Sequence, residues 1–263
     1  MAIWIIALTG GAGAALLMLL LWLVQRRTGN AGIIDVGWSA AVGGMAVFCA
    51  VAGTGEPARR LMLGAMGGLW GFRLATHLLV DRVVGKPEEG RYRELRAHWQ
   101  RHLQWKLLGF FELQAVAVVL LSLPFLLGTA DASPFPAGGD LLALAVFAVG
   151  WLGEWTADRQ LRAFKADAAS HGRTCRRGLW RYSRHPNYFF EWVIWCAFAL
   201  GAAGAPAGWL AWIAPAIMLL LLVWVTGIPP AEQQALRSRG DDYRRYQRET
   251  SAFVPWFPRR ANP

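Results

Sequence analysis

The stretch IWIIALTGGAGAALLMLLLWLV, residues 3–24, carries no charged side chain. About 20 apolar residues in an α-helix are enough to cross the hydrocarbon core of a bilayer. Similar runs recur along the 263-residue chain, which is 55% hydrophobic and 17% charged. We therefore expect an all-α integral membrane protein that forms a single membrane domain over residues 1–263.

Seven transmembrane helices are predicted, near residues 3–24, 33–53, 61–80, 107–128, 140–158, 188–205 and 207–228. The second and third are rich in Gly and carry Asp35, Arg73 and His77, so buried or re-entrant helices are the alternative for these two. Gln25-Arg26-Arg27 follows the first segment and is typical of a membrane-edge anchor rather than a signal peptide.

Lys and Arg residues are concentrated in alternate loops and in the C-terminal tail, whereas the loop at 129–139 has none. Because basic loops tend to stay in the cytosol, we expect the N-terminus outside and the C-terminus in the cytosol. The net charge of +10 is then mainly a signal of topology and does not indicate nucleic-acid binding. A basic cytosolic face could attract anionic lipid headgroups or a phosphate-bearing cofactor.

Cysteine and histidine are few and scattered. Cys49 and Cys196 lie in apolar segments and Cys175 stands alone in a loop, so the sequence predicts neither a disulfide framework nor a metal site. His98 and His102 have the i,i+4 spacing that a metal site can use. They lie in RAHWQRHLQW, however, where an amphipathic helix at the membrane interface is favoured.

Polar side chains inside predicted spans are costly in a bilayer and often functional. Asp35 and Trp38 are one turn apart on the second span, and Trp70, Arg73 and His77 follow i, i+3, i+7 spacing on the third. Such groups could line a cavity, or they could hold the helices together through hydrogen bonds.

The motif GLWRYSRHPNYFFEW, residues 178–192, places polar side chains at the start of the sixth span. Pro186 fixes φ, so we expect a helix to begin at Pro186 or Asn187. Asn187 and Glu191 offer the acceptor and donor pattern that a carboxamide needs, and the arginines upstream offer phosphate contacts. These features indicate a nicotinamide dinucleotide, although no GxGxxG unit is present.

That motif resembles the steroid 5α-reductase family, as do VTGIPPAEQQALRSRGDDYRRYQRETSAFVPWFP, IIDVGW and WGFRLATHLL. The likeness is greatest to the bacterial branch of DUF1295 proteins and covers most of the chain. It implies a seven-helix protein of the bacterial inner membrane that binds NADPH from the cytosolic side. It also implies reduction of a carbon–carbon double bond conjugated to a carbonyl, in an apolar molecule such as a Δ4-3-keto steroid, with membrane lipids and no nucleic acid as partners.

The resemblance also implies roles for matching positions. Asn187 and Glu191 match the family's residues around the nicotinamide, and Asp158 with Lys165 matches an acidic and a basic residue of the fifth helix. The expected cofactor-binding residues lie mainly within 154–263 and are Asp158, Arg162, Lys165, Arg173, Tyr182, Arg184, His185, Asn187, Tyr188, Glu191, Glu232 and Tyr243.

Activation of the carbonyl is expected from Asp35, which is the best counterpart of a family Glu in the second helix. In a dry cavity it would be a neutral donor, and His77 could relay its proton. Trp38, Trp70 and Arg73 are expected to line the substrate cavity. The family's third-helix Tyr, which contacts the substrate carbonyl, has no counterpart in the third span.

The C-terminal half also resembles the isoprenylcysteine carboxyl methyltransferase group, which binds S-adenosylmethionine. Its motif contains Arg-His-Pro followed by Tyr, with a downstream Glu-Glu, where this chain has Glu232-Gln233. The extra N-terminal spans, together with Asn187 and Glu191, favour the reductase. A non-catalytic membrane scaffold would leave the concentrated arginines and the intramembrane acids without a role.

Overall fold

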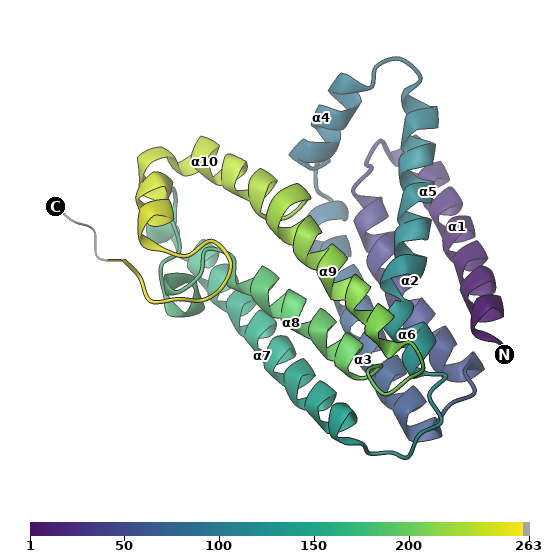
Figure 1. Ribbon diagram of the computed structural model, residues 1–263. Coiled ribbons are helices and arrows are strands. Elements are labelled where there is room, and N and C mark those ends of the chain that lie inside the picture. The colour runs from purple at the N-terminus through teal and green to yellow at the C-terminus, as the bar shows by residue number, and fades with distance from the viewer. Residues whose placement is uncertain (260–263) are drawn as a thin grey trace. The chain divides into compact units, whose positions relative to one another are not determined.

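A computed structural model describes residues 1–259 of the chain. Within that range the chain is helical and forms no β-strand, only an isolated bridge between Ser183 and Ser251 (Figure 1). The predicted all-α class is therefore confirmed. The chain divides into two compact units, Met1–Leu141 with Phe198–Ala214 (unit 1) and Leu142–Ala197 with Pro215–Pro263 (unit 2).

The longer helices, in chain order, are α1 (Ile3–Thr28), α2 (Ile33–Ala52), α3 (Pro57–Leu78), α4 (Gly90–His98), α5 (Leu103–Leu121), α6 (Leu123–Gly128), α7 (Gly138–Ala166), α8 (Pro186–Leu200), α9 (Ile213–Leu220) and α10 (Ile228–Glu249). Shorter turns are the 3-10 segments η2 (Ala168–Ser170), η3 (Gly178–Arg181) and η4 (Gly208–Trp212), and the π segments η1 (Leu79–Val83) and η5 (Leu221–Val225).

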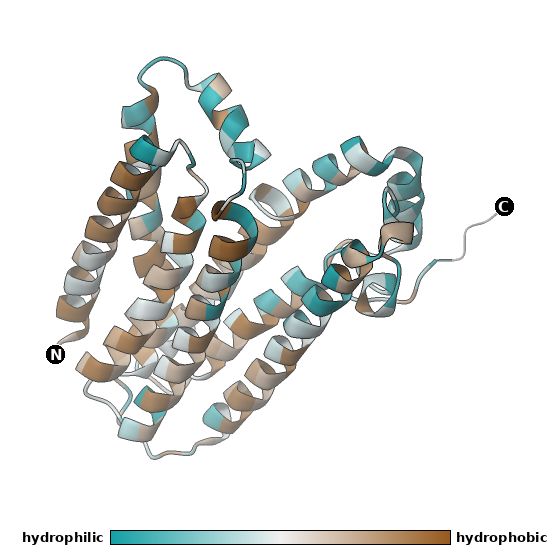
Figure 2. Ribbon diagram, turned by 180° about the vertical axis from the view of Figure 1, so that it is seen from behind, coloured by the Kyte–Doolittle hydropathy of each residue, from teal (hydrophilic) through white to brown (hydrophobic). Residues whose placement is uncertain are grey.

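Among residues 1–259, five helical stretches are long and apolar enough to cross a membrane, namely Ile3–Thr28, Ile33–Ala52, Leu103–Gly128, Gly138–Ala166 and Gly208–Glu249. In the last of these the apolar residues end near Val225, and the rest is the charged helix α10. Figure 2 shows this contrast between hydrophobic helices and the hydrophilic residues of α4 and the C-terminal half of α10. The chain is thus a membrane protein, while the count of seven spans and their orientation stay predictions.

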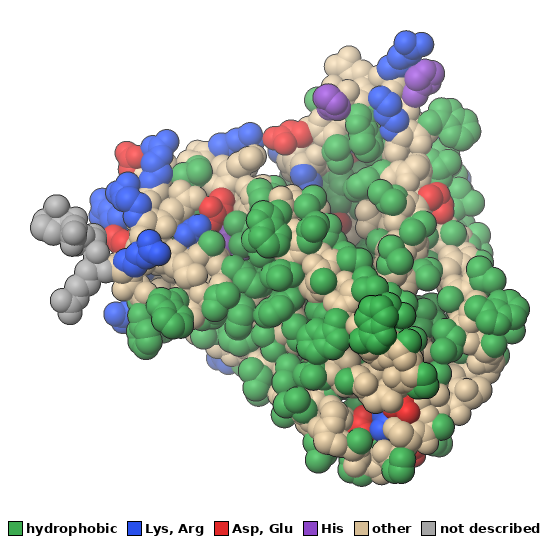
Figure 3. Space-filling view, viewed as in Figure 1, with side chains coloured by type: hydrophobic (Ala, Val, Ile, Leu, Met, Phe, Trp, Pro, Cys, Tyr) green, Lys and Arg blue, Asp and Glu red, His purple; other side chains and the backbone are tan. Residues whose placement is uncertain are grey.

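Helices α3 and α8 are not among those five stretches. Helix α8 has only 15 residues, and α3 carries Arg59, Arg60 and Arg73. Elsewhere, large apolar side chains face outward along the helices, for example Trp4 and Leu8 of α1. Hydrophobic side chains likewise cover much of the face seen in Figure 3. Water would penalise this exposure, whereas lipid tails do not.

Helices α2 and α3 of unit 1 pack closely because small residues face each other. A Cβ added at Gly71 would lie 2.6 Å from the Cα of Gly43, and one added at Gly67 would lie 2.4 Å from the Cβ of Ala46. Glycine at these positions lets two backbones approach to a distance that a side chain would block.

In unit 2, α7 packs against the first part of α8. A Cβ at Gly150 would meet Ile194, and one at Gly153 would meet the ring of Phe190. Helix α8 begins at Pro186, as the sequence predicted. The loop before it is held to α7, because the indole of Trp180 donates to the carbonyl oxygen of Ala157 at 2.9 Å.

Helix α10 bends at Gly240, which has φ 50° and ψ −122°. This left-handed φ suits glycine, since a Cβ would be crowded there. The bend separates Glu232 on the first half of α10 from Tyr243, Tyr246 and Gln247 on the second half. The bend therefore lets side chains from both halves of α10 contact one another.

Candidate functional site

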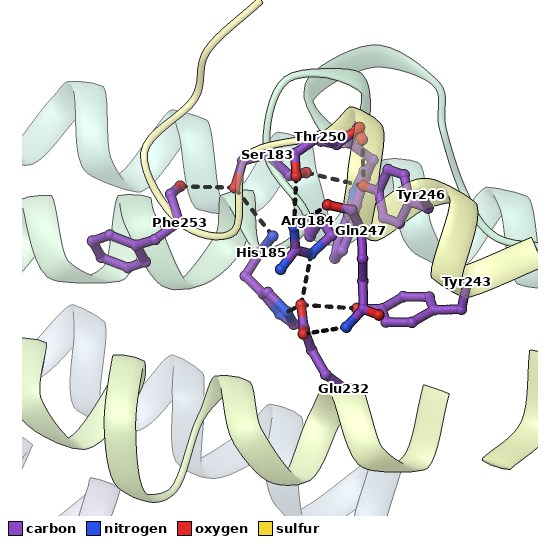
Figure 4. A network of polar contacts seen from close by, with 10 residues as sticks. Ser183, Arg184, His185, Glu232, Tyr243, Tyr246, Gln247, Thr250 and Phe253 are labelled. Carbon is purple, nitrogen blue, oxygen red and sulfur yellow. Dashed lines mark hydrogen bonds and ion pairs between the residues drawn. The ribbon is translucent and has the colours of Figure 1, made fainter. Parts of the chain in front are cut away.

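A network of polar side chains centres on Glu232 in unit 2 (Figure 4). Its Oε1 atom accepts from Arg184 Nε at 2.6 Å and from the Tyr243 hydroxyl at 3.2 Å. The same oxygen lies 3.3 Å from His185 Nε2, and Oε2 accepts from Gln247 Nε2 at 2.6 Å. The loop before α8 and both halves of α10 thus meet at one carboxylate.

The charge on Glu232 is stabilised by these donors. Burial by itself raises the pKa of this carboxyl, but the hydrogen bonds from His185 and Arg184 and the charge of Arg184 outweigh it. The pKa of Glu232 falls from its ordinary value of 4.5 to about 2. Glu232 is therefore ionised at neutral pH, and it balances the charge of Arg184.

Backbone acceptors complete the network. Arg184 Nη1 donates to the carbonyl oxygens of Thr250 at 2.6 Å and Gln247 at 3.1 Å. The Tyr246 hydroxyl donates to the carbonyl oxygens of Trp180 and, at 3.1 Å, Ser183. Because these contacts join the 178–185 loop to the end of α10, they hold the loop in one conformation.

A second ion-pair group lies near the first. Arg176 Nη1 donates to Glu249 Oε2 at 2.8 Å, and Arg176 Nη2 donates to Asp242 Oδ1 at 3.0 Å. The other Asp242 oxygen accepts from the backbone N–H of Thr174 at 2.7 Å. Residues 174–176 are thereby tied to the same C-terminal helix.

Asn187 in the first turn of α8 carries an acceptor that the protein does not use. Its Nδ2 atom is 3.3 Å from Asp158 Oδ1, whereas its Oδ1 atom is buried and has no hydrogen-bond partner. A buried acceptor without a partner costs free energy of about 1–3 kcal/mol. Asn187 is thus suited to accept from a group that the protein itself does not supply, such as an N–H of a bound carboxamide.

Most of the other residues expected to bind a cofactor are either exposed basic side chains or partly buried side chains near Asn187. Arg162, Lys165 and Arg173 are exposed. Tyr182 packs edge-on against Phe257, with ring centroids 6.1 Å apart. The ring of Tyr188 stacks on His185 at 5.3 Å, and Glu191 is half-buried one turn after Asn187. The structure therefore places all twelve expected cofactor residues in unit 2, where Arg184, His185, Glu232 and Tyr243 bind each other.

In unit 1, Asp35 at the start of α2 meets two residues of α4. One carboxyl oxygen pairs with Arg91, and the other accepts from the Tyr92 hydroxyl at 2.8 Å. Both oxygens of Asp35 thus lie within hydrogen-bonding distance of a donor group, and the expected role of Asp35 as the carbonyl-activating acid stays a prediction. Tyr92 is buried, and its burial together with the Asp35 charge raises the pKa of its phenol well above the ordinary value.

The remaining residues expected near a substrate lie on α2 and α3. Trp70 is fully buried between Trp38 and Phe198, with edge-on ring contacts at 5.9 and 6.2 Å. Arg73 is half-buried on the same helix. The Nδ1 atom of His77 lies 3.4 Å from Asp81, so the structure brings His77 to a different carboxylate from Asp35.

No group of three or more metal-ligating side chains occurs within residues 1–259. The predicted interfacial helix over RAHWQRHLQW is wrong as a continuous element. Helix α4 ends at His98, His102 has a positive φ of 58°, and α5 begins at Leu103. The two histidines consequently do not share one helix face.

Several residues of both sites were not predicted from the sequence. Tyr92 and Arg91 were not linked to Asp35, and Tyr246 and Gln247 were not linked to the loop before α8. A signal was present only for the second pair, because Tyr243, Tyr246 and Gln247 follow the i, i+3, i+4 spacing of one helix face.

These features define a class, namely an all-helical membrane protein whose C-terminal part forms a polar side-chain network. More narrowly, the chain belongs to the family described as "Protein of unknown function (DUF1295)", which matches residues 21–250. An uncharacterized protein of Schizosaccharomyces pombe is 26% identical over 264 residues, covering 89% of this chain and 75% of that protein. No solved structure matches the chain.

Proposed function

We propose that this protein is an NADPH-dependent oxidoreductase of the steroid 5α-reductase type. The observation that carries the proposal is the buried, unpartnered Oδ1 atom of Asn187 in the first turn of α8. An amide oxygen there, with Glu191 one turn later, suits the carboxamide of a nicotinamide ring. Arg162, Lys165 and Arg173 are exposed in the same unit and available to its phosphates.

The Glu232 network has a supporting role in this proposal. Arg184, His185 and Tyr243 spend their hydrogen bonds on Glu232 and on backbone oxygens. We therefore assign them to positioning: they fix the loop that leads into Asn187. Rigid support of this kind keeps a binding group in its productive geometry.

When bound, reduced nicotinamide supplies a hydride to the β-carbon of a double bond conjugated to a carbonyl. Negative charge then develops on the carbonyl oxygen as an enolate, and a placed donor lowers the barrier. Protonation of the α-carbon by water or by that donor completes the reduction. We assign that donor to Tyr92, whose raised pKa keeps its phenol protonated at neutral pH. Without substrate the single phenol proton is donated to Asp35, which is itself fixed by Arg91, so the hydroxyl must turn from Asp35 to the carbonyl oxygen when substrate binds. Tyr92 thus takes the place of the family tyrosine that the third span lacks.

The proposed substrate is an apolar enone, such as a Δ4-3-keto steroid that would become a 5α-dihydrosteroid. An apolar substrate can enter from the bilayer, and the half-buried Trp38 of α2 offers aromatic surface, with the buried Trp70 of α3 packed edge-on against it. The proposal includes seven spans in a bacterial inner membrane, with the N-terminus outside and the C-terminus in the cytosol, because the basic residues gather in alternate loops.

Cofactor binding by the purified, detergent-solubilised protein tests the proposal. We expect NADPH to raise the melting temperature, and the isosteric Asn187→Leu variant to bind NADPH roughly tenfold more weakly, because one buried hydrogen bond is lost. Asp241→Asn, a change at an exposed residue of α10, is the matched control and should bind as the wild type does.

S-Adenosylmethionine provides the second arm of that experiment. Stabilisation by S-adenosylmethionine instead of NADPH would favour the methyltransferase alternative. If neither compound stabilises the protein, both the reductase and the methyltransferase assignments are wrong. With NADPH bound, addition of a conjugated ketone should consume the absorbance of reduced nicotinamide, and a saturated ketone should not.

A further inference from the structure

The C-terminal part of unit 2 combines a polar cavity with exposed aromatic side chains. The cavity has a volume of about 390 Å³, and its lining includes Arg184, Arg248, Thr250, Trp256 and Arg259. Trp256 is 69% exposed and its neighbour Phe257 is 77% exposed. Side chains of this size seldom stay in water without a partner, because each exposes a large apolar area.

The exposed aromatic residues belong to a segment that is held in place. The backbone N–H of Trp256 donates to the Tyr182 carbonyl oxygen at 2.9 Å, and that of Arg259 donates to the Glu249 carbonyl oxygen at 2.8 Å. The N–H of Arg184 donates to the Ser251 oxygen at 2.8 Å. Trp256 and Phe257 are therefore presented by a fixed backbone rather than by a loose tail.

The charges around the cavity leave a positive rim. Arg184 is balanced by Glu232, and Glu249 shares the charge of Arg176 with Asp242, so two further arginines outweigh the one unbalanced carboxylate. Arg248 and Arg259 are both exposed at the same cavity. Figure 3 shows Lys and Arg side chains gathered at this end of unit 2. Guanidinium groups bind phosphate oxygens with two parallel hydrogen bonds, so the rim suits a phosphate group.

We propose that this surface binds the phosphate headgroup of an anionic membrane phospholipid. Arg248 and Arg259 contact the phosphate, while Trp256 and Phe257 enter the boundary between headgroups and acyl chains. A soluble phosphate compound offers the same charge, but it would leave both aromatic side chains in water. The bilayer covers them, and the apolar helices of this chain already bring it to a bilayer.

Hydrogen exchange of the full-length protein in lipid nanodiscs tests this proposal. We expect the peptide covering 250–259 to exchange several-fold more slowly in discs containing phosphatidylglycerol than in discs of phosphatidylcholine alone. High salt should remove the difference, because it screens charges at a membrane surface. The double variant Arg248→Gln/Arg259→Gln should lose it, while Arg244→Gln/Arg245→Gln, with the same charge change at exposed residues of α10, should keep it.

Three results would overturn the proposal. The first is equal exchange in both kinds of disc, and the second is equal loss of protection in the two double variants. The third is protection in phosphatidylcholine discs on addition of inorganic phosphate or NADPH, which would assign the cavity to a soluble ligand. Unchanged exchange of the α8 peptide in each variant verifies folding, so none of these results can come from an unfolded chain. The exchange measurement does not depend on reductase activity, so it tests lipid binding independently of the proposed function.

Discussion

At the scale of single residues, Tyr92 and Asp35 form the contact with the clearest consequence for chemistry. The phenol donates to a carboxylate that Arg91 also holds, so the hydroxyl has a defined direction. A protonated phenol that turns from this carboxylate to a substrate can stabilise charge on its carbonyl oxygen.

Tyr92→Phe should lower kcat for reduction of an enone by roughly 100-fold, the effect of removing one donor to a developing oxyanion. NADPH affinity should not change, because Asn187 and its neighbours are untouched. Steady-state rates and cofactor titration of the same preparation measure both quantities. Arg93→Gln, at an exposed residue of the same helix, is the control. If Tyr92→Phe keeps full activity, Tyr92 is not the donor to the carbonyl oxygen.

In unit 2, Glu232 is the residue whose contacts have the clearest consequence for stability. In Glu232→Gln the amide oxygen can still accept from Arg184, but the charge that balances this largely buried guanidinium is gone. We expect a loss of about 2–4 kcal/mol in the free energy of unfolding. Thermal unfolding in detergent, compared with the wild type, measures it.

Asp241→Asn is the matched control for Glu232→Gln. Its ion pair with Arg244 is exposed, and Asp241 itself is 91% exposed. Exposed pairs contribute about 0–1 kcal/mol, so this variant should unfold close to the wild-type temperature. Equal losses in the two variants would show that the Glu232 network does not stabilise unit 2.

At the scale of helices, the close approach of α2 and α3 depends on glycine. In Gly71→Ala the new methyl group would lie 2.6 Å from the Cα of Gly43 and from the Ser39 carbonyl oxygen, which are backbone atoms that cannot move aside alone. We expect destabilisation by about 1–3 kcal/mol, measured by thermal unfolding. In Gly44→Ala the methyl group meets nothing within 4 Å, so no loss is expected. If both variants behave alike, close packing at Gly71 is not what joins the helices.

Single helices were predictable where one residue restricts the backbone or where apolar runs are long. Pro186 starts α8 because its ring fixes φ, and the apolar runs placed α1, α2, α5 and α7. The interfacial helix through His98 and His102 was not predictable by the same method. Amphipathic spacing continues across that break, but the chain turns there, with His102 at positive φ.

At the scale of the whole molecule, Arg59 and Arg60 are exceptions to the expected topology, because they are basic residues on the side predicted to be outside. Arg59 lies on the side predicted to be outside, yet it is 2% exposed and pairs with Asp140 at 2.8 Å and Asp131 at 3.2 Å. All three residues belong to unit 1. Because Arg59 is neutralised by its neighbours, it should have little weight in orienting the chain.

Cysteine labelling of intact cells with a membrane-impermeant maleimide tests this orientation. Gly138→Cys, in an exposed position at the start of α7, should react from outside. Asp241→Cys on α10 should react only after the membrane is permeabilised. The unmodified chain is the background control, since Cys49 and Cys175 are buried. The opposite pattern would mean that the N-terminus is in the cytosol.

The sequence alone determined that this chain is helical and apolar enough for a membrane, since length and composition decide that without any knowledge of packing. It also placed the start of α8 and indicated that Asn187 and its neighbours form a polar group. Only the tertiary structure decided that Tyr92 meets Asp35, or that Glu232 joins Arg184 to Gln247 across the bend at Gly240. Such pairs lie tens of residues apart or across a bend, where no helical period connects them, so the folded backbone alone brings their atoms within hydrogen-bonding distance.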